Sequence, residues 1–248
     1  MMTTSKKSEY KLCSLLFDTI EGNFDANLQT LLSLIDKAPK KSLIVAPEVC
    51  LSGFDYKNYE EAITFSDVAD EALKVASSNK IIITTMLQRE NGEVFNFAKI
   101  FFNGEIVYKR AKAKLFRFGD EHKYMSEGCE DEVKIVEVDG IKIGILICFE
   151  LRFKTFWQKL EGCDVIAVPS WWGVLRTEHF KVLTRALAII NQCYVVVSDS
   201  LNVECTKMSG IITPHGEDER NEHRAYFELA YEKKEIQMMR RYMDVGIG

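Results

Sequence analysis

The sequence predicts an α/β protein in which mixed β-sheets are covered by helices. In the first and last thirds of the chain, short apolar runs alternate with segments whose apolar residues recur at helical spacing, as in β-α-β units. The middle third carries Asn-Gly and Asp-Gly pairs between β-like runs, and such pairs favour antiparallel hairpins. The 248 residues include only four prolines and no low-complexity linker, so we expect one domain over residues 1–248.

Apolar spacing places the first elements. Tyr10–Phe17 and Ser42–Ala46 predict strands, and Asn27–Ile35 between them predicts a helix because its leucines share one face. A second helix is expected over Asp67–Ser77. The isoleucines and threonines of Lys80–Gln88 then favour a strand.

The middle and final elements follow from turns and from renewed alternation. Both residues of Asn91-Gly92, Asn103-Gly104 and Asp139-Gly140 tolerate positive φ, so each pair predicts a hairpin turn. After Ile147, the expected elements are a helix over Phe153–Leu160, a strand over Asp164–Pro169, a helix over Thr177–Gln192, a strand over Cys193–Asp199, a hairpin at His215-Gly216, a strand over Tyr226–Tyr231 and a helix over Glu235–Tyr242.

Composition excludes several classes of function. The 32 Lys and Arg against 37 Asp and Glu give a net charge of −5 without a long basic run, so we expect no nucleic-acid partner. Strongly apolar runs, such as Ile141–Phe149, are far shorter than the roughly 20 residues that span a bilayer, so we expect no membrane partner. Met1–Lys11 carries no apolar signal segment and the seven cysteines form no CxxC pair, which favours a cytoplasmic protein with reduced thiols.

Cys148 stands where an apolar run ends and polar residues open an expected helix. A side chain at such a turn lies at the rim of the sheet. The N–H groups that follow it can lower the pKa of a thiol and hold a developing oxyanion. Cys148 is therefore a candidate nucleophile, and the alternative is that it is one of seven ordinary buried thiols.

Two other features stand near expected strand ends. Glu48 comes directly after an apolar run and a proline, where its carboxylate is a candidate base for a cysteine nucleophile or else a solvated loop acid or helix cap. Lys109, Arg110, Lys112 and Lys114 place four cations in six residues, a run that usually marks only a solvated face. The four histidines share no motif and offer no metal-ligand spacing, so we expect no metal.

In this order, the stretches around Glu48, Lys112 and Cys148 resemble the nitrilase superfamily of carbon–nitrogen hydrolases. Pro47-Glu48 followed by Gly53-Phe54 is similar to the family's PE-x-x-x-x-GF segment. Leu115-Phe116 aligns Lys112 with the lysine of Y-x-K-x-H-L-F, and Lys114 replaces the histidine. The segment that begins at Cys148 resembles C-Y-D-L-R-F. The similarity runs from about Tyr10 to the C-terminus and includes Val168–Trp171, Ala188–Gln192 and Ser209–Gly216.

The resemblance implies a four-layer α-β-β-α sandwich with two mixed sheets and no cofactor. It implies that Glu48, Lys112 and Cys148 converge at one end of the sheets as base, oxyanion-binding cation and nucleophile. Cys148 would then attack a small amide, release ammonia and leave a thioester that water hydrolyses to the acid. The Phe149 N–H is the expected second donor to the oxyanion.

Arg117–His122 resembles the stretch after the lysine in ω-amidases, where a second glutamate positions the substrate, and Glu121 is that residue here. The resemblance thus favours a small-molecule amide of a carboxylic acid as substrate, and it implies a homo-oligomer, a dimer or larger. Phe54, Trp171 and Trp172 are candidates to wall the pocket, or else ordinary core aromatics. Leu187, Ile190 and Lys154 depart from the family pattern. These departures concern which subfamily the chain resembles and how it assembles more than its chemistry.

Alternative functions stay open from the sequence. Within the superfamily, the chain could instead be an N-carbamoyl amide hydrolase, a nitrilase or a catalytically silent binding protein. Outside it, Cys148 could work with His179 and Asn191 as a histidine-dependent hydrolase, although no local motif supports this. A glutaminase with a G-x-C-x-G elbow is disfavoured because no glycine stands two residues from Cys148. Ammonia release from amides, with Cys148→Ala as control, separates these possibilities.

Overall fold

The computed structural model describes residues 10–220 and 223–247. Its strands are β1 (Lys11–Leu15), β2 (Ser42–Val45), β3 (Lys80–Glu90), β4 (Glu93–Phe102), β5 (Glu105–Ala111), β6 (Val136–Val138), β7 (Ile141–Ile145), β8 (Val165–Pro169), β9 (Tyr194–Ser198), β10 (Gly210–Ile212) and β11 (Tyr226–Ala230). Its α-helices are α1 (Phe24–Lys37), α2 (Tyr59–Ala76), α3 (Lys154–Lys159), α4 (Thr177–Asn191) and α5 (Lys233–Tyr242). Of the polar N-terminal segment, residues 1–9 lie outside the described part.

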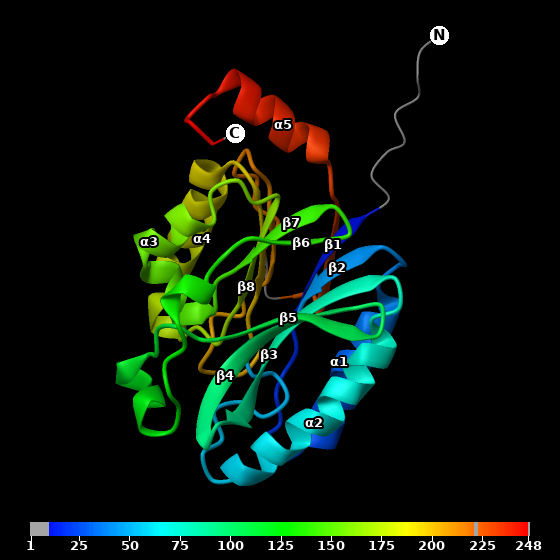
Figure 1. Ribbon diagram of the computed structural model, residues 1–248, viewed down its shortest axis with the longest axis vertical. Helices are drawn as coiled ribbons and strands as arrows, with labels where there is room; N and C mark the ends of the chain where they lie inside the picture. The colour runs from blue at the N-terminus through cyan, green and yellow to red at the C-terminus, as the bar shows by residue number, and fades with distance from the viewer. Residues whose placement is uncertain (1–9, 221–222, 248) are drawn as a thin grey trace.

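The strands form two mixed sheets. The first has the order β11-β1-β2-β3-β4-β5 and the second the order β10-β9-β8-β7-β6. In each sheet three neighbouring strands are parallel, namely β1 to β3 and β7 to β9, and the flanking strands are antiparallel. Helices α1 and α2 cover the outer face of the first sheet, and α3 and α4 cover that of the second (Figure 1). The expected four-layer sandwich is confirmed.

Alternation along the strands builds the layers. Leu43 and Val45 of β2 point into the core between the sheets, where they join Ile143 and Ile145 of β7. Ile44 points the other way, into the core beneath α1 and α2. Because side chains of a strand alternate between its faces, one short strand can serve both cores only if all its residues are apolar. This explains the unbroken apolar runs of the parallel strands.

The three predicted hairpin turns are confirmed. Asn91, Asn103 and Asp139 have φ values of 52°, 49° and 48°, and the glycine after each has a φ of 85°, 89° or 79°. Positive φ at both central positions matches the right-handed twist of the two strands that each turn joins.

The structure differs from the prediction at three places. Helix α2 begins at Tyr59 rather than Asp67, and Glu60 and Glu61 in its first turn favour that start through the helix dipole. The hairpin at His215-Gly216 is reduced to one bridge between Ile212 and Asp218, since β10 pairs with β9 and the chain then crosses to the other sheet. The turn after β7 is a 3₁₀ helix, and α3 follows it. No helix of the described residues is long and apolar enough to cross a membrane.

Candidate active site

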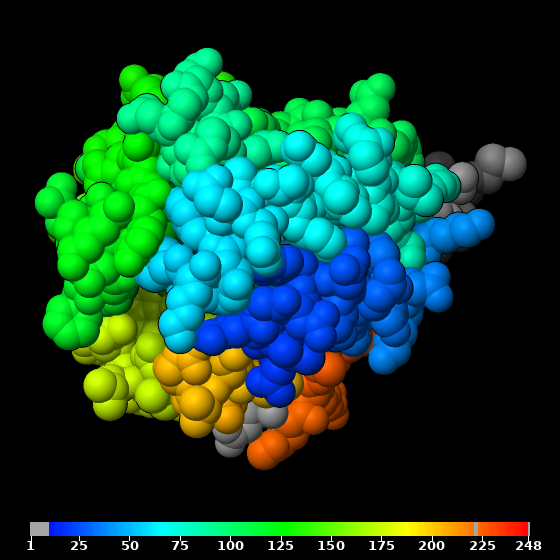
Figure 2. Space-filling model, turned by 90° about the horizontal axis from the view of Figure 1, so that it is seen from below, coloured from blue at the N-terminus to red at the C-terminus, as the bar shows by residue number. Residues whose placement is uncertain are grey.

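Four segments that are distant in the sequence meet on one face of the molecule. They follow β2, β5, β8 and β9, and Figure 2 shows their light-blue, green, yellow-green and orange surfaces side by side. Three of these strands are parallel strands whose carboxyl ends lie at this face. In α/β sheets, ligands bind at such carboxyl ends, so this face is the place to look for a site.

Lys112 lies at the centre of a buried cluster. Its Nζ donates to Glu48 Oε1 at 2.7 Å and to Glu121 Oε1 at 2.8 Å. The side chains of Glu48 and Lys112 have no exposed surface, and that of Glu121 has 5%. Lys114 instead pairs with Glu130, away from the cluster. The structure therefore brings together three of the residues singled out by sequence.

Backbone groups and an asparagine hold the two carboxylates in place. Glu48 accepts hydrogen bonds from Asn96 Nδ2 at 2.8 Å and from the Trp171 N–H at 3.2 Å, and Glu121 accepts one from the Phe116 N–H at 2.9 Å. The Asn96 carbonyl also accepts the Lys112 N–H at 2.8 Å. Asn96 thus contacts both partners of the ion pair. Asn96 was not singled out by sequence, although a lone asparagine within an apolar strand was a signal.

Cys148 begins a 3₁₀ helix, Cys148–Arg152, three residues after the end of β7 at Ile145. Its φ is +44°, a left-handed conformation that a residue with a side chain seldom adopts. Such backbone conformations persist only where the surroundings impose them, and they cluster at functional sites. The expected α-helical N-terminus is therefore a tight, strained turn that presents the thiol.

A buried ion pair imposes this turn. Glu150 accepts two hydrogen bonds from the Arg110 guanidinium, at 2.9 and 2.6 Å, and one each from the Ala113 and Ile147 N–H groups, both at 2.7 Å. Both charged side chains are almost completely inaccessible. Ala113 follows Lys112 and Ile147 precedes Cys148, so the pair fixes the lysine of one sheet relative to the cysteine of the other.

Burial and charge oppose each other at the cluster. Burial raises the pKa of Glu48, and Lys112 offsets only part of this rise. Burial acts to lower the pKa of Lys112, but the charges of Glu48 and Glu121 prevail and raise it. Burial and the charge of Glu48 raise the pKa of the Cys148 thiol well above its ordinary value, while Lys112 acts to lower it. Lys112 therefore stays charged, and the thiol keeps its proton until a base removes it.

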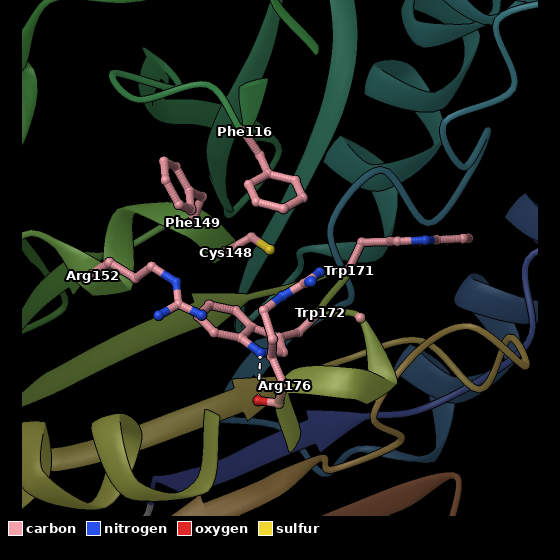
Figure 3. A pocket seen from close by; sticks show the side chains of 8 residues that line it. Phe116, Cys148, Phe149, Arg152, Trp171, Trp172 and Arg176 are labelled. Atoms are coloured by element: carbon pink, nitrogen blue, oxygen red, sulfur yellow. Dashed lines mark hydrogen bonds between the residues drawn. The ribbon is translucent and has the colours of Figure 1, made fainter. Parts of the chain in front are cut away.

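The cluster opens into a cavity of about 440 Å³. Its wall includes Cys148 and Glu121 together with the predicted Phe54 and Trp171. A narrow extension beside the thiol is lined by the other two predicted residues, Phe149 and Trp172. Figure 3 shows the thiol between two groups of side chains, the rings of Phe116 and Phe149 on one side and Trp172 with the two arginines, Arg152 and Arg176, on the other. Neither arginine was singled out by sequence.

The residues of the histidine-dependent alternative do not gather at the thiol. His179 Nδ1 lies 3.1 Å from Arg152 Nη2, and Asn191 Nδ2 donates to the Trp157 carbonyl at 2.8 Å. Across residues 10–220 and 223–247, no cluster of three or more His, Cys, Asp and Glu side chains is arranged to hold a metal ion.

Comparison with known proteins agrees with the fold and the resemblance. The family model of the carbon-nitrogen hydrolases matches residues 18–219. The chain is 31% identical over 195 residues to 2-oxoglutaramate amidase of Bacillus subtilis, covering 75% of this chain and 74% of that protein. It is 31% identical over 199 residues to Omega-amidase YafV of Escherichia coli K12, covering 77% of each.

Solved structures share the architecture. XC1258 of Xanthomonas campestris, described as a CN-hydrolase superfamily protein, superposes with a TM-score of 0.83 at 21% identity over 94% of both chains. Nit3 of Saccharomyces cerevisiae, a member of the nitrilase superfamily, gives 0.79 at 20% identity over 96% of this chain and 95% of that one. The chain belongs to the carbon–nitrogen hydrolase family.

Proposed function

We propose that this protein is an amidase that converts a small amide to its carboxylic acid and ammonia through a thioester on Cys148. The observation that carries the proposal is the burial of Lys112 between Glu48 and Glu121 at the base of a cavity that also exposes the Cys148 thiol. Family membership supports the reaction class. The B. subtilis and E. coli relatives, named as amidases, support an amide as the substrate.

In the first half-reaction, Glu48 accepts the thiol proton as the sulfur of Cys148 attacks the amide carbon. The resulting oxyanion is held by the Lys112 ammonium and the Phe149 N–H, and loss of one such donor costs ~10²–10³ in rate in other enzymes. The tetrahedral intermediate then collapses. Its C–N bond breaks, the nitrogen takes the proton from Glu48 and leaves as ammonia, and the thioester remains.

In the second half-reaction, Glu48 takes a proton from a water molecule as its oxygen attacks the thioester carbon. The C–S bond breaks, the acid is released, and the proton returns from Glu48 to the sulfur. The raised pKa of Glu48 suits this double role, because a base with a pKa closer to neutrality can both accept and return a proton. Glu121 has no part in these transfers and positions Lys112 and the substrate.

The cavity favours an amide that also carries a carboxylate. Two arginines, Arg152 and Arg176, line the narrow extension beside Cys148, and the Arg152 guanidinium lies 4.8 Å from the centroid of the Trp172 ring. An arginine recognises a carboxylate by paired, charge-assisted hydrogen bonds. The relatives named 2-oxoglutaramate amidase and Omega-amidase point to the same class of substrate, the monoamide of a dicarboxylic acid.

The test is ammonia release from matched compounds of one acyl chain: the monoamide of a dicarboxylic acid, its N-carbamoyl analogue and its nitrile. We expect turnover of the monoamide and loss of that turnover in Cys148→Ala. Preference for the carbamoyl compound or the nitrile would move the protein to another branch of the superfamily. Absence of turnover for all three compounds would favour a catalytically silent binding protein.

We also propose that the protein works as a homo-oligomer in the reducing cytoplasm. Helix α4 exposes Val182, Ile189 and Ile190 on its outer face, an apolar patch typical of an interface. All seven cysteines are free thiols, as a reducing compartment favours. Light scattering of the wild type and of Ile190→Glu tests the assembly: we expect a dimer or larger for the first and a smaller species for the second. A monomeric wild type would contradict it.

A further inference from the structure

Arg176 reaches into the catalytic cavity from the segment after β8. It lines both the wide part and the narrow extension, and both also contain Cys148. Its guanidinium carbon lies 5.1 Å from the centroid of the Phe116 ring, on the side where Figure 3 shows the thiol. None of the ion pairs among residues 10–220 and 223–247 involves Arg176 or Arg152. Two cations thus lie beside Cys148, and Glu204, an acid that also lines the wide part of the cavity, forms no ion pair with either of them in the described part of the chain.

Gly173 provides the space that the Arg176 guanidinium occupies. Its φ of −62° and ψ of 134° are open to any residue, so the backbone does not require glycine here. A Cβ at this position, however, would lie only 2.6 Å from Arg176 Nη2. The atom in the way is the end of a flexible side chain, so an added methyl group would displace the guanidinium rather than unfold the segment.

The backbone of Arg176 is independently fixed. Its carbonyl accepts the Trp172 indole N–H at 2.9 Å, and its N–H donates to the Gly173 carbonyl at 3.0 Å. The side chain of Arg176 therefore begins at a fixed position. The missing Cβ of Gly173 then leaves the space that its guanidinium occupies. Burial and the like charge of Arg176 lower the pKa of Arg152, so the two guanidinium groups lie close enough to repel each other.

We propose that Gly173 and Arg176 determine specificity: the guanidinium, seated in the space that Gly173 leaves, binds the carboxylate of a monoamide substrate whose amide group lies at Cys148. This inference rests on the proposed function for its substrate. A neutral amide leaves the guanidinium without a partner, whereas a carboxylate accepts its hydrogen bonds and neutralises one of the two cations. The wall of the cavity thereby selects acids with an amide at the far end.

The first test needs no turnover. Cys148 is alkylated with iodoacetate or with iodoacetamide, which differ in charge; in both reactions the sulfur forms a bond to carbon and iodide leaves. Peptide mapping gives the rate at Cys148 alone. The ratio of the iodoacetate rate to the iodoacetamide rate should fall by roughly tenfold in Gly173→Ala and Arg176→Gln, the scale for losing a charged hydrogen bond. The acids at the cavity, Glu48, Glu121 and Glu204, are present in all variants, so their repulsion of iodoacetate cancels from the comparison.

Arg117→Gln is the matched control. Arg117 is exposed and lines a neighbouring cavity, which shares Phe116 with the catalytic cavity but does not contain Cys148. This replacement also removes one positive charge close to the catalytic cavity. We expect it to change the ratio of the iodoacetate rate to the iodoacetamide rate by less than twofold. An unchanged ratio in both Gly173→Ala and Arg176→Gln overturns the proposal. An equal fall in Arg117→Gln also overturns it, because the effect would then be general attraction of anions. A thermal melt of each variant confirms folding.

The second test uses turnover of a monoamide acid and of its methyl ester, which lacks the charge. Gly173→Ala should raise KM for the acid and lower the acid-to-ester ratio of kcat/KM by roughly tenfold. A proportional loss on both substrates overturns the specificity role. If the alkylation ratio shifts as expected but the wild type releases no ammonia, the proposed function fails while the anion site stands.

Discussion

Glu150→Gln tests the buried ion pair that joins the two sheets at the site. The Glu150 carboxylate accepts four hydrogen bonds, two from Arg110 and one each from the Ala113 and Ile147 N–H groups. Glutamine keeps the shape but has one acceptor oxygen and one NH₂ donor. Whichever way its amide turns, the NH₂ group faces a donor, and Arg110 loses its counter-charge at a position where its side chain is almost completely buried.

The structure sets the size of the effect. Removal of one partner from a buried ion pair costs about 3–5 kcal/mol, because the remaining charge stays desolvated. For a chain of this length, each kcal/mol lowers the Tm by about 2–4 °C, so the midpoint should fall by roughly 6–20 °C. The matched control is Glu90→Gln, whose pairing with Lys109 at 3.4 Å is partly exposed and should be worth less than about 1 kcal/mol.

The assay is thermal unfolding of the three proteins at neutral pH, followed by circular dichroism. Iodoacetamide should also alkylate Cys148 of Glu150→Gln at a rate that differs from the wild-type rate, because the ion pair fixes the strained turn at the thiol. A fall in Tm no larger than that of Glu90→Gln would refute the view that this pair holds the two sheets together. Partial recovery in the double variant Arg110→Met, Glu150→Leu would support it, since neither buried charge is then left alone.

Three further predictions concern the proposed catalytic residues and the reactive thiol. Glu121→Gln should fold normally, yet turn over substrate on the order of 10²-fold more slowly because Lys112 loses a partner that positions it; intact mass should still show acylation of Cys148 by an activated ester, and wild-type turnover would remove Glu121 from the site. The rate kcat/KM should fall as pH drops through the pKa of Glu48, which burial raises, so its acid limb should lie above pH 4.5; a limb at or below that value would contradict Glu48 as the base. Iodoacetamide should label Cys148 and the exposed Cys129, and Cys129→Ser should lose activity on labelling just as the wild type does; protection by that substitution would move the essential thiol to Cys129.

Local chemistry made much of the fold predictable. The Asn-Gly and Asp-Gly turns are confirmed because positive φ at both positions is a local requirement that few other pairs satisfy. The parallel strands are confirmed because burial on both faces demands an unbroken apolar run. The start of α2 at Tyr59 was missed because Ser66, a polar residue, stands on the buried face of the helix between Ile63 and Ala69 and interrupts the apolar spacing.

The candidate site was less accessible to sequence reasoning without the resemblance. The run Lys109 to Lys114 suggested a solvated face, yet Arg110 and Lys112 are buried. Arg110 lies in β5 and Lys112 directly follows it. Residues two apart on a strand point to the same face, and this spacing was the available signal that both side chains face the core. Their partners, Glu150 and Glu48, lie 40 and 64 residues away in the chain. Nothing local to Arg176 marks it, since its place depends on the space at Gly173.

The proposed reaction requires a thioester on Cys148, and mass spectrometry can detect it. A p-nitrophenyl ester of the monoamide's parent acid acylates quickly, so hydrolysis of the thioester becomes the slow step. Acid quench during turnover should show a mass increase of one acyl group, mapped to the peptide that contains Cys148, and Cys148→Ala should show neither adduct nor amide turnover. An adduct on another residue, or amide turnover that persists in Cys148→Ala, would contradict the account.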